Sequence, residues 1–149
     1  MKTTPAGRTL HVAEPPAAWL HRAPVVADCS VLAAIVFDEP AGAEAARMLA
    51  GKALHAPTLL PYEMANVARG KQRGGLAEAS VKAALADFAE QRLQLVAAPP
   101  DALLALALRH ALSAYDAAYL WLAGELQAPL ATFDAKLAKA ASHHLRNLE

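Results

Sequence analysis

The chain has 149 residues, and its 14 basic and 14 acidic side chains give a formal net charge of zero at pH 7. This length suits one domain with a substantial core, and 56% hydrophobic residues exclude a mainly disordered chain. The zero net charge argues against a protein that holds long nucleic acid by bulk charge, although a small local site remains open.

Three features of the sequence indicate the compartment. Cys29 is the only cysteine, so a disulfide framework is excluded and a reducing compartment is expected. Residues 1–16 lack the apolar stretch of a secretory signal. The longest segment without charged residues, 53–62, contains two prolines and is far shorter than the ~20 residues that cross a bilayer. We therefore expect a cytoplasmic protein that does not contact a membrane.

The first 23 residues differ in pattern from the rest of the chain. Three of the ten prolines fall here, and no hydrophobic period is sustained. We expect residues 1–23 to be an extension that is mobile or loosely docked, attached to a single domain that spans 24–149.

From residue 24 onward, short β-like runs alternate with helical stretches. The predicted strands are 24–28, 53–57, 93–97, 129–133 and 145–148. The predicted helices are 30–37, 43–50, 59–71, 76–91, 102–112, 115–126 and 134–142. This alternation favours the α/β class, with a parallel sheet that helices cover on both faces.

Polar residues set two of the expected helix starts. Thr58 is expected to cap the helix at 59–71, which tolerates Pro61 in its first turn. Asp101 is expected to cap the helix at 102–112.

Four carboxylates lie where an α/β sheet would bring them together. Ligands bind at the carboxyl ends of parallel strands, and Asp28 closes the first predicted strand while Asp134 follows the fourth. Asp116 begins a helix that is apolar almost all round, and Glu63 lies on an apolar stripe of its own helix. If the four converge, each pair about 6 Å apart repels by roughly 3 kcal/mol at an effective dielectric near 20.

Such a cluster requires either bound cations or raised pKa values. Magnesium or manganese suits it best, because both are hard ions that prefer oxygen ligands. Zinc does not, since none of the six histidines stands at ligand spacing beside the acids and Cys29 is alone.

Each acid taken singly also has a structural interpretation. Asp28 and Asp134 could each be only the N-cap of the following helix, and Asp116 could cap its own helix. Glu63 could point into solvent or pair with Arg69. The presence of four separate acids at strand ends or in apolar segments is what favours a shared site.

The segments around the four acids resemble the PIN domains, and most closely the VapC-type toxins of bacterial toxin–antitoxin pairs. They are VVADCSVLAAIVFDEP, LLPYEMANVARG, LSAYDAAYLWLAGEL and PLATFDAKLAKAA, in this order within residues 24–148. The resemblance implies a three-layer α/β/α fold with a five-stranded parallel sheet. It also implies a Mg²⁺- or Mn²⁺-dependent endoribonuclease, usually a homodimer, that a small VapB-like antitoxin inhibits. The alternative is a PIN-like module that binds RNA or protein without catalysis.

The resemblance also assigns roles to the acids. Asp28, Glu63 and Asp116 would bind metal directly, and Asp134 would bind it directly or through water. All four are therefore the expected catalytic residues, and cleavage of the phosphodiester would leave a 5′-phosphate.

Three polar residues near the acids are candidates for supporting roles. Ser30 and Thr132 each lie two residues from an acid, so their hydroxyls could steady a carboxylate or a metal-bound water, or simply cap a helix. Asn66 follows Glu63 by about one helical turn and could hydrogen-bond in the same pocket or lie on the surface.

Basic residues at the end of the Glu63 helix are candidates for RNA phosphate contacts. They are Arg69, Lys71 and Arg73, with Arg109 and Lys136 as weaker candidates. The same string could also be a solvated helix end, where cations are favourable near the C-terminal dipole.

The aromatic residues near Asp116 suggest how the chain assembles. We expect Cys29, Trp121, Tyr115 and Tyr119 to lie in the core or in a dimer contact. Trp121, Leu122 and Tyr119, with the alanine-rich helices, offer more apolar surface than one thin sheet can cover. A twofold homodimer is therefore expected.

Overall fold

The computed structural model describes residue 13 and residues 22–148. The extension predicted at 1–23 lies almost entirely outside these described residues. Among them, no helix is long and apolar enough to cross a membrane.

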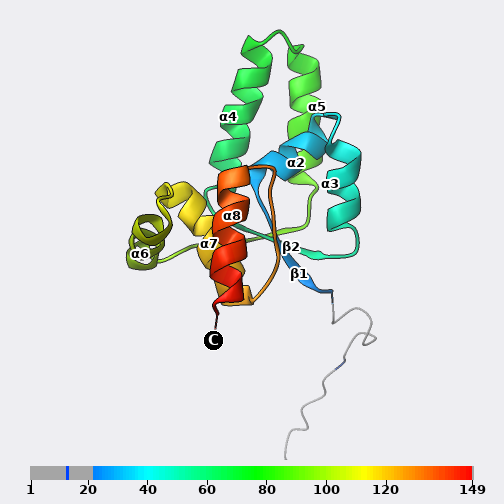
Figure 1. Ribbon diagram of the computed structural model, residues 1–149. Helices are drawn as coiled ribbons and strands as arrows, with labels where there is room; N and C mark the ends of the chain where they lie inside the picture. The colour runs from blue at the N-terminus through cyan, green and yellow to red at the C-terminus, as the bar shows by residue number, and fades with distance from the viewer. Residues whose placement is uncertain (1–12, 14–21, 149) are drawn as a thin grey trace, which may run out of the picture.

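Four parallel strands form one sheet at the centre of the described chain (Figure 1). They are β1 (Pro24–Ala27), β2 (Ala53–Pro57), β3 (Leu93–Val96) and β4 (Leu130–Ala131). The strand order is β3-β2-β1-β4, so the chain first moves outward from β1 and later returns to its other side. The register aligns Val26 with His55 of β2 and with Leu130 of β4. The reversal of strand order beside β1 creates the place where open α/β sheets bind ligands.

The fifth strand predicted at 145–148 is wrong, because the last helix continues through most of this segment. Helix α8 (Ala135–Arg146) ends at its C-cap Asn147. Leu137 and Ala141 are buried, and Leu145, four residues further on, packs against the same core. This four-residue period is helical, and a run as short as LRNL does not distinguish a strand from a helix end. Among the described residues the sheet thus has four strands and ends at β4.

One group of helices packs on the sheet through α7. The group comprises α6 (Pro100–His110), α7 (Ala114–Leu126) and α8. Helix α7 contacts β1, β2 and β4, while α6 and α8 pack against α7. The nearly all-round apolar pattern of α7 is explained by this central position, which buries Tyr119, Leu120 and Leu122 almost completely.

The second group of helices packs around α2. It comprises α2 (Cys29–Val36), α3 (Gly42–Leu49), α4 (Leu60–Arg73) and α5 (Glu78–Ala89). Helix α3 approaches α2 so closely that a Cβ at Gly42 would lie 2.5 Å from the carbonyl oxygen of Ala34. Val25 and Val26 of β1 point to opposite faces of the sheet and are both buried, so both faces of β1 are covered. Figure 1 shows α4 and α5 projecting side by side from the body of the molecule.

Two helices begin differently from the prediction. The N-cap of α4 is Leu59 rather than Thr58, and the N-cap of α6 is Pro99 rather than Asp101. Neither cap makes a side-chain hydrogen bond. Both helices carry a proline in the first two positions, where its fixed φ favours helix initiation without a capping side chain.

Candidate metal centre

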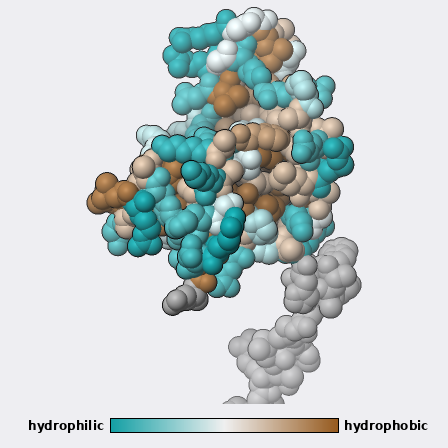
Figure 2. Space-filling view, viewed as in Figure 1, coloured by the Kyte–Doolittle hydropathy of each residue, from teal (hydrophilic) through white to brown (hydrophobic). Residues whose placement is uncertain are grey.

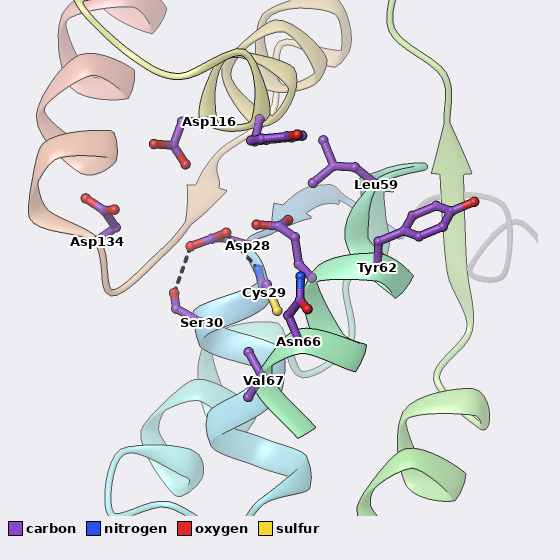
Figure 3. A pocket seen from close by; sticks show the side chains of 11 residues that line it. Asp28, Cys29, Ser30, Leu59, Tyr62, Asn66, Val67, Asp116 and Asp134 are labelled. Carbon is purple, nitrogen blue, oxygen red and sulfur yellow. Dashed lines mark hydrogen bonds between the residues drawn. The ribbon is translucent and has the colours of Figure 1, made fainter. Parts of the chain in front are cut away.

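A pocket of about 600 Å³ lies where β1 and β4 end. All four predicted acids line it, namely Asp28, Glu63, Asp116 and Asp134. Figure 3 shows Asp116 and Asp134 facing Asp28 across the hollow. The other lining residues are Cys29, Ser30, Leu59, Tyr62, Asn66, Val67 and Tyr115, so no lysine or arginine lies in the described wall. The volume is within the range of small-ligand pockets.

The acids reach the pocket from the starts of four helices. Asp28 is the N-cap of α2, and Asp134 is the N-cap of α8, where it accepts from two backbone N–H groups. Asp116 and Glu63 lie in the first turns of α7 and α4. Helix N-termini carry partial positive charge, so four of them directed to one place favour anionic side chains there. Capping and pocket lining are thus combined in Asp28 and Asp134.

Two structural roles considered for the other acids, capping by Asp116 and pairing of Glu63 with Arg69, are not observed. Asp116 does not cap α7, because the cap is Ser113, whose Oγ accepts from the backbone N–H of Asp116 at 3.1 Å. Glu63 accepts a hydrogen bond from Tyr119 instead of pairing with Arg69.

Asp28 is held by three hydrogen bonds and is 7% exposed. Its Oδ1 accepts from the backbone N–H of Cys29 at 2.7 Å. Its Oδ2 accepts from the hydroxyls of Ser30 at 2.8 Å and Thr132 at 2.7 Å. Three donors offset much of the cost of burying this carboxylate and fix its direction.

The same two hydroxyls connect Asp28 to the start of α8. The Oγ of Ser30 accepts from the backbone N–H of Phe133 at 3.0 Å, and Oγ1 of Thr132 accepts from that of Asp134 at 2.9 Å. Each hydroxyl therefore donates to Asp28 and accepts from the β4–α8 turn. This arrangement fixes the positions of Asp28 and Asp134 relative to each other.

Tyr119 positions Glu63, a contact that the sequence analysis did not identify. The Tyr119 hydroxyl is fully buried with its ring and donates to Oε1 of Glu63 at 2.6 Å. Burial and this bond raise the pKa of Tyr119, so the phenol remains a donor. Tyr119 follows Asp116 by three residues on α7, which places both on one face of the helix. This three-residue spacing is the feature of the sequence that could have placed Tyr119 near the acids.

The pKa values of two acids are raised above their ordinary range. Burial raises the pKa of Glu63, and the charges of Asp28 and Asp116 raise it further, against the Tyr119 hydrogen bond. Burial also raises the pKa of Asp116, as do the charges of Asp134 and Asp28, against Ser113 and Lys136. The neighbouring carboxylates are therefore close enough to oppose the ionisation of Glu63 and Asp116.

A model of the PIN domain family matches residues 25–142. The chain belongs to the PIN domain family. PIN domains are generally metal-dependent nucleases. The crystal structure of PAE2754 from Pyrobaculum aerophilum is similar in fold, with a TM-score of 0.60 over 85% of this chain and 89% of that one, at 22% sequence identity. No curated protein matches the sequence.

The pocket of this PIN domain fits a hard divalent ion by its donor chemistry. Its acids supply only oxygen ligands, and no lysine or arginine of the described wall neutralises them. Among the described residues, no three acidic, histidine or cysteine side chains are arranged to hold a metal ion, so an ion bound here would require the carboxylates to move. Burial raises the pKa of the Cys29 thiol to about 12, which keeps it protonated and removes it as a soft ligand.

The predicted RNA-contacting cations of the PIN domain are not equivalent. Lys71 forms an ion pair with Glu39 at 2.6 Å and lies 5.7 Å from the ring centre of Phe37. Arg69 and Arg73 are exposed and lie outside the pocket wall. Lys71 is therefore held in an ion pair within the protein.

The weaker cation candidates also differ. Lys136 lies in the first turn of α8, and its charge lowers the pKa of Asp116, so it stands near the pocket. Arg109 lies in the last turn of α6, where its charge adds to burial and to His143 in lowering the pKa of His110. Asn66, predicted as a supporting residue, lines the pocket and is exposed.

Two exposed tyrosines line the pocket, a position that the sequence analysis predicted for neither. Tyr115, expected in the core or in a dimer contact, is 66% exposed and lines the pocket. Tyr62 lines it as well and is 77% exposed. Tyr119 and Cys29, by contrast, are buried in the core as expected.

Proposed function

We propose that this PIN domain is a Mg²⁺- or Mn²⁺-dependent endoribonuclease of the VapC toxin type. One observation carries the proposal: Asp28, Glu63, Asp116 and Asp134 line a single pocket whose described wall contains no lysine or arginine. A solvated or purely structural set of acids does not require such convergence. The proposal takes the family's metal-dependent nuclease chemistry and assigns it to RNA.

The residues of the chain prepare the pocket before substrate arrives. Three hydrogen bonds hold Asp28, and Tyr119 holds Glu63, so these two carboxylates lose little freedom when a ligand binds. Asp116 and Asp134 complete the donor set from the starts of α7 and α8. A divalent ion, when bound, would lower the pKa of the attacking water and neutralise charge on the cleaved phosphate.

Sequencing of RNA ends after incubation with the purified protein tests the proposal. We expect cleavage that requires Mg²⁺ or Mn²⁺, leaves 5′-phosphates, and is lost in Asp28→Asn. Asp87→Asn, which removes an exposed carboxylate on α5, is the matched control and should cleave like the wild type. If the wild type cleaves no RNA with either metal, a binding module without catalysis becomes the better account.

The toxin assignment predicts a cellular phenotype and an inhibitor. Expression of the chain alone should arrest growth, and a small partner encoded beside it should reverse the arrest. The pocket offers the partner a simple mode of inhibition, because an inserted arginine or lysine would neutralise the four acids in place of metal. Glu63→Gln should be tolerated at equal abundance. Equal harm, or equal harmlessness, of wild type and Glu63→Gln would contradict the toxin assignment.

We also propose a homodimer, with a contact that differs from the one first expected. Tyr119 and Leu122 are buried within the chain and are not available to a second copy. Leu104 and Leu108 lie one turn apart on α6 and are 61% and 76% exposed. Light scattering should give about twice the protomer mass of 15.6 kDa, and Leu108→Glu should reduce it. A wild-type mass near 15.6 kDa at micromolar concentration would contradict the dimer.

A further inference from the structure

Two of the acids are preceded in sequence by a tyrosine. Tyr62 precedes Glu63 in the first turn of α4, and Tyr115 precedes Asp116 in the first turn of α7. Neighbouring residues of a helix point about 100° apart, so one member of each pair can face the pocket while the other lies at its edge. All four side chains line the same pocket.

The exposure of these tyrosines is unusual for this molecule. The three most exposed large hydrophobic side chains of the described residues are Tyr62 at 77%, Leu108 at 76% and Tyr115 at 66%. Two of the three therefore stand at the candidate metal centre. A large aromatic ring that the fold leaves in water beside a pocket is available to a flat ligand.

The pocket has a charged side and an apolar side. Figure 3 shows Asp116 and Asp134 on one side, Leu59 and Tyr62 on the other, and Asp28 between them. The apolar side continues into a second hollow of about 220 Å³, which shares Leu59 and Tyr115 with the pocket. The remaining wall of this hollow is mostly apolar, formed by Pro57, Thr58, Ala98, Leu103, Ala114 and Ala118.

We propose that Tyr62 and Tyr115 form a nucleobase subsite that stacks unpaired bases beside the phosphate held at the acids. The proposal rests on the proposed ribonuclease function and adds the two side chains that would hold bases beside the cleaved bond. A nucleotide combines a charged phosphate with a flat apolar base, which matches the two sides of the pocket. Aromatic rings stack on any base, but only on bases that are not already stacked in a duplex. The tyrosines would thus select unpaired RNA without reading its sequence.

Fluorescence anisotropy with short labelled RNA tests the subsite. Binding is measured in Ca²⁺, which takes carboxylate oxygens and so neutralises the acids, and gels check that the RNA stays intact. The RNAs are a single strand, its perfect duplex, and the same single strand with abasic residues in place of bases. The variants are Tyr62→Ala, Tyr115→Ala, their phenylalanine counterparts, and Met48→Ala as an exposed control outside the pocket.

The expected result is specific to stacking. Each alanine variant should raise the Kd for the single strand roughly fivefold or more, the loss that follows when an aromatic platform is removed. The phenylalanine variants and Met48→Ala should bind like the wild type, because a phenyl ring also stacks. The abasic strand should bind wild type and alanine variants equally weakly, and duplex binding should not change.

Three outcomes would overturn the subsite. The alanine variants could bind the single strand like the wild type, they could lose equal affinity for the abasic strand, or they could lose equal affinity for the duplex. Cleavage in Mg²⁺ separates this failure from failure of the nuclease. If the wild type cleaves RNA and the alanine variants keep its KM, only the subsite is wrong. If the wild type shows base-dependent binding without cleavage, the subsite stands and the nuclease assignment fails.

Discussion

The acid pocket and a cluster of three histidines are two places where ionisable groups of one kind gather in this fold. His143 and His144 lie in the last turn of α8, at the opposite end of that helix from Asp134. The ring of His110 meets them edge-on, with centroid distances of 5.8 Å to His143 and 5.5 Å to His144. At both places burial opposes charge, since it lowers the pKa of His110 and His144 and raises that of Glu63 and Asp116.

The two clusters differ in what surrounds them. The acids face an open pocket and receive hydrogen bonds from helix starts and hydroxyls. The histidines pack ring against ring, and Nε2 of His110 is buried and has no hydrogen-bond partner among the described residues. Donors and open volume keep the acids usable as ligands, whereas close packing favours neutral histidines. A cluster of ionisable groups therefore indicates a ligand site only when the fold also provides hydrogen-bond partners and open volume for the charged form. Figure 2 shows one face of the resulting surface, where hydrophilic and hydrophobic residues are interspersed over the body.

The largest predicted effect that separates the two clusters is the response to metal. Mn²⁺ at about 100 times its Kd should stabilise the wild type by about 2.7 kcal/mol, or roughly 5–10 °C in Tm. Asp116→Asn should melt higher than the wild type without metal, because it relieves repulsion, and should lose most of the gain with metal. His143→Gln is the control and should respond to Mn²⁺ like the wild type. An Asp116→Asn variant with the Tm and metal response of the wild type would contradict a shared acid site.

The next effect concerns the partner of Glu63. Tyr119→Phe keeps the buried ring and removes only the donor to Glu63, so it should cost about 1–2 kcal/mol of unfolding free energy at pH 7. Affinity for Mn²⁺ should also fall, because Glu63 is no longer held in place. Urea unfolding and metal titration measure the two quantities. Tyr62→Phe, which removes an exposed hydroxyl, should change neither, and equal behaviour of the two variants would refute the positioning role of Tyr119.

The smallest effect is the pH response of the histidine cluster. The pKa values of His110 and His144 are lower in the folded protein than the ordinary 6.5, so the unfolded chain binds protons more readily. Their contribution to stability is present above about pH 6.5 and is lost as the pH falls below it. Thermal unfolding from pH 7.5 to 5 should therefore show a smaller loss of Tm in His110→Gln than in wild type. Parallel curves for the two proteins would contradict the prediction.

Much of the fold followed from local patterns in the sequence. The first four strands were located because each is a short apolar run bounded by turn residues, as in 53–57 before Thr58. Strand ends were also the reason that Asp28 and Asp134 could be placed at one edge of the sheet. The strand prediction at 145–148 failed, because four residues are too few to distinguish a strand period from a helical one. Packing of Leu145 against the core accompanies the helical conformation there.

The direction of side chains within the helices could not be predicted from the sequence. Tyr115 and Tyr119 stand one turn apart on α7, yet Tyr119 is buried on Glu63 while Tyr115 lies in solvent at the pocket edge. The sequence analysis placed both in the core or in a dimer contact, because a tyrosine suits a buried or a partly exposed environment. Their different exposure follows only from the way in which α7 docks on the sheet. The same docking buries Tyr119 and Leu122, two of the residues on which the dimer contact was first placed.

The hydrogen bond from Thr132 to Asp28 joins residues 104 positions apart in the chain, and this has a consequence for the order of synthesis. A chain interrupted before β4 already contains Asp28, Glu63 and Asp116, but it lacks Asp134 and one of the donors that hold Asp28. Contacts so distant in sequence form late, because the ribosome must deliver both partners first. The pocket is therefore incomplete throughout translation of the first 130 residues. Under the proposed ribonuclease function, a prematurely terminated product would be inert, and the nascent chain would not cut the messenger from which it is being made.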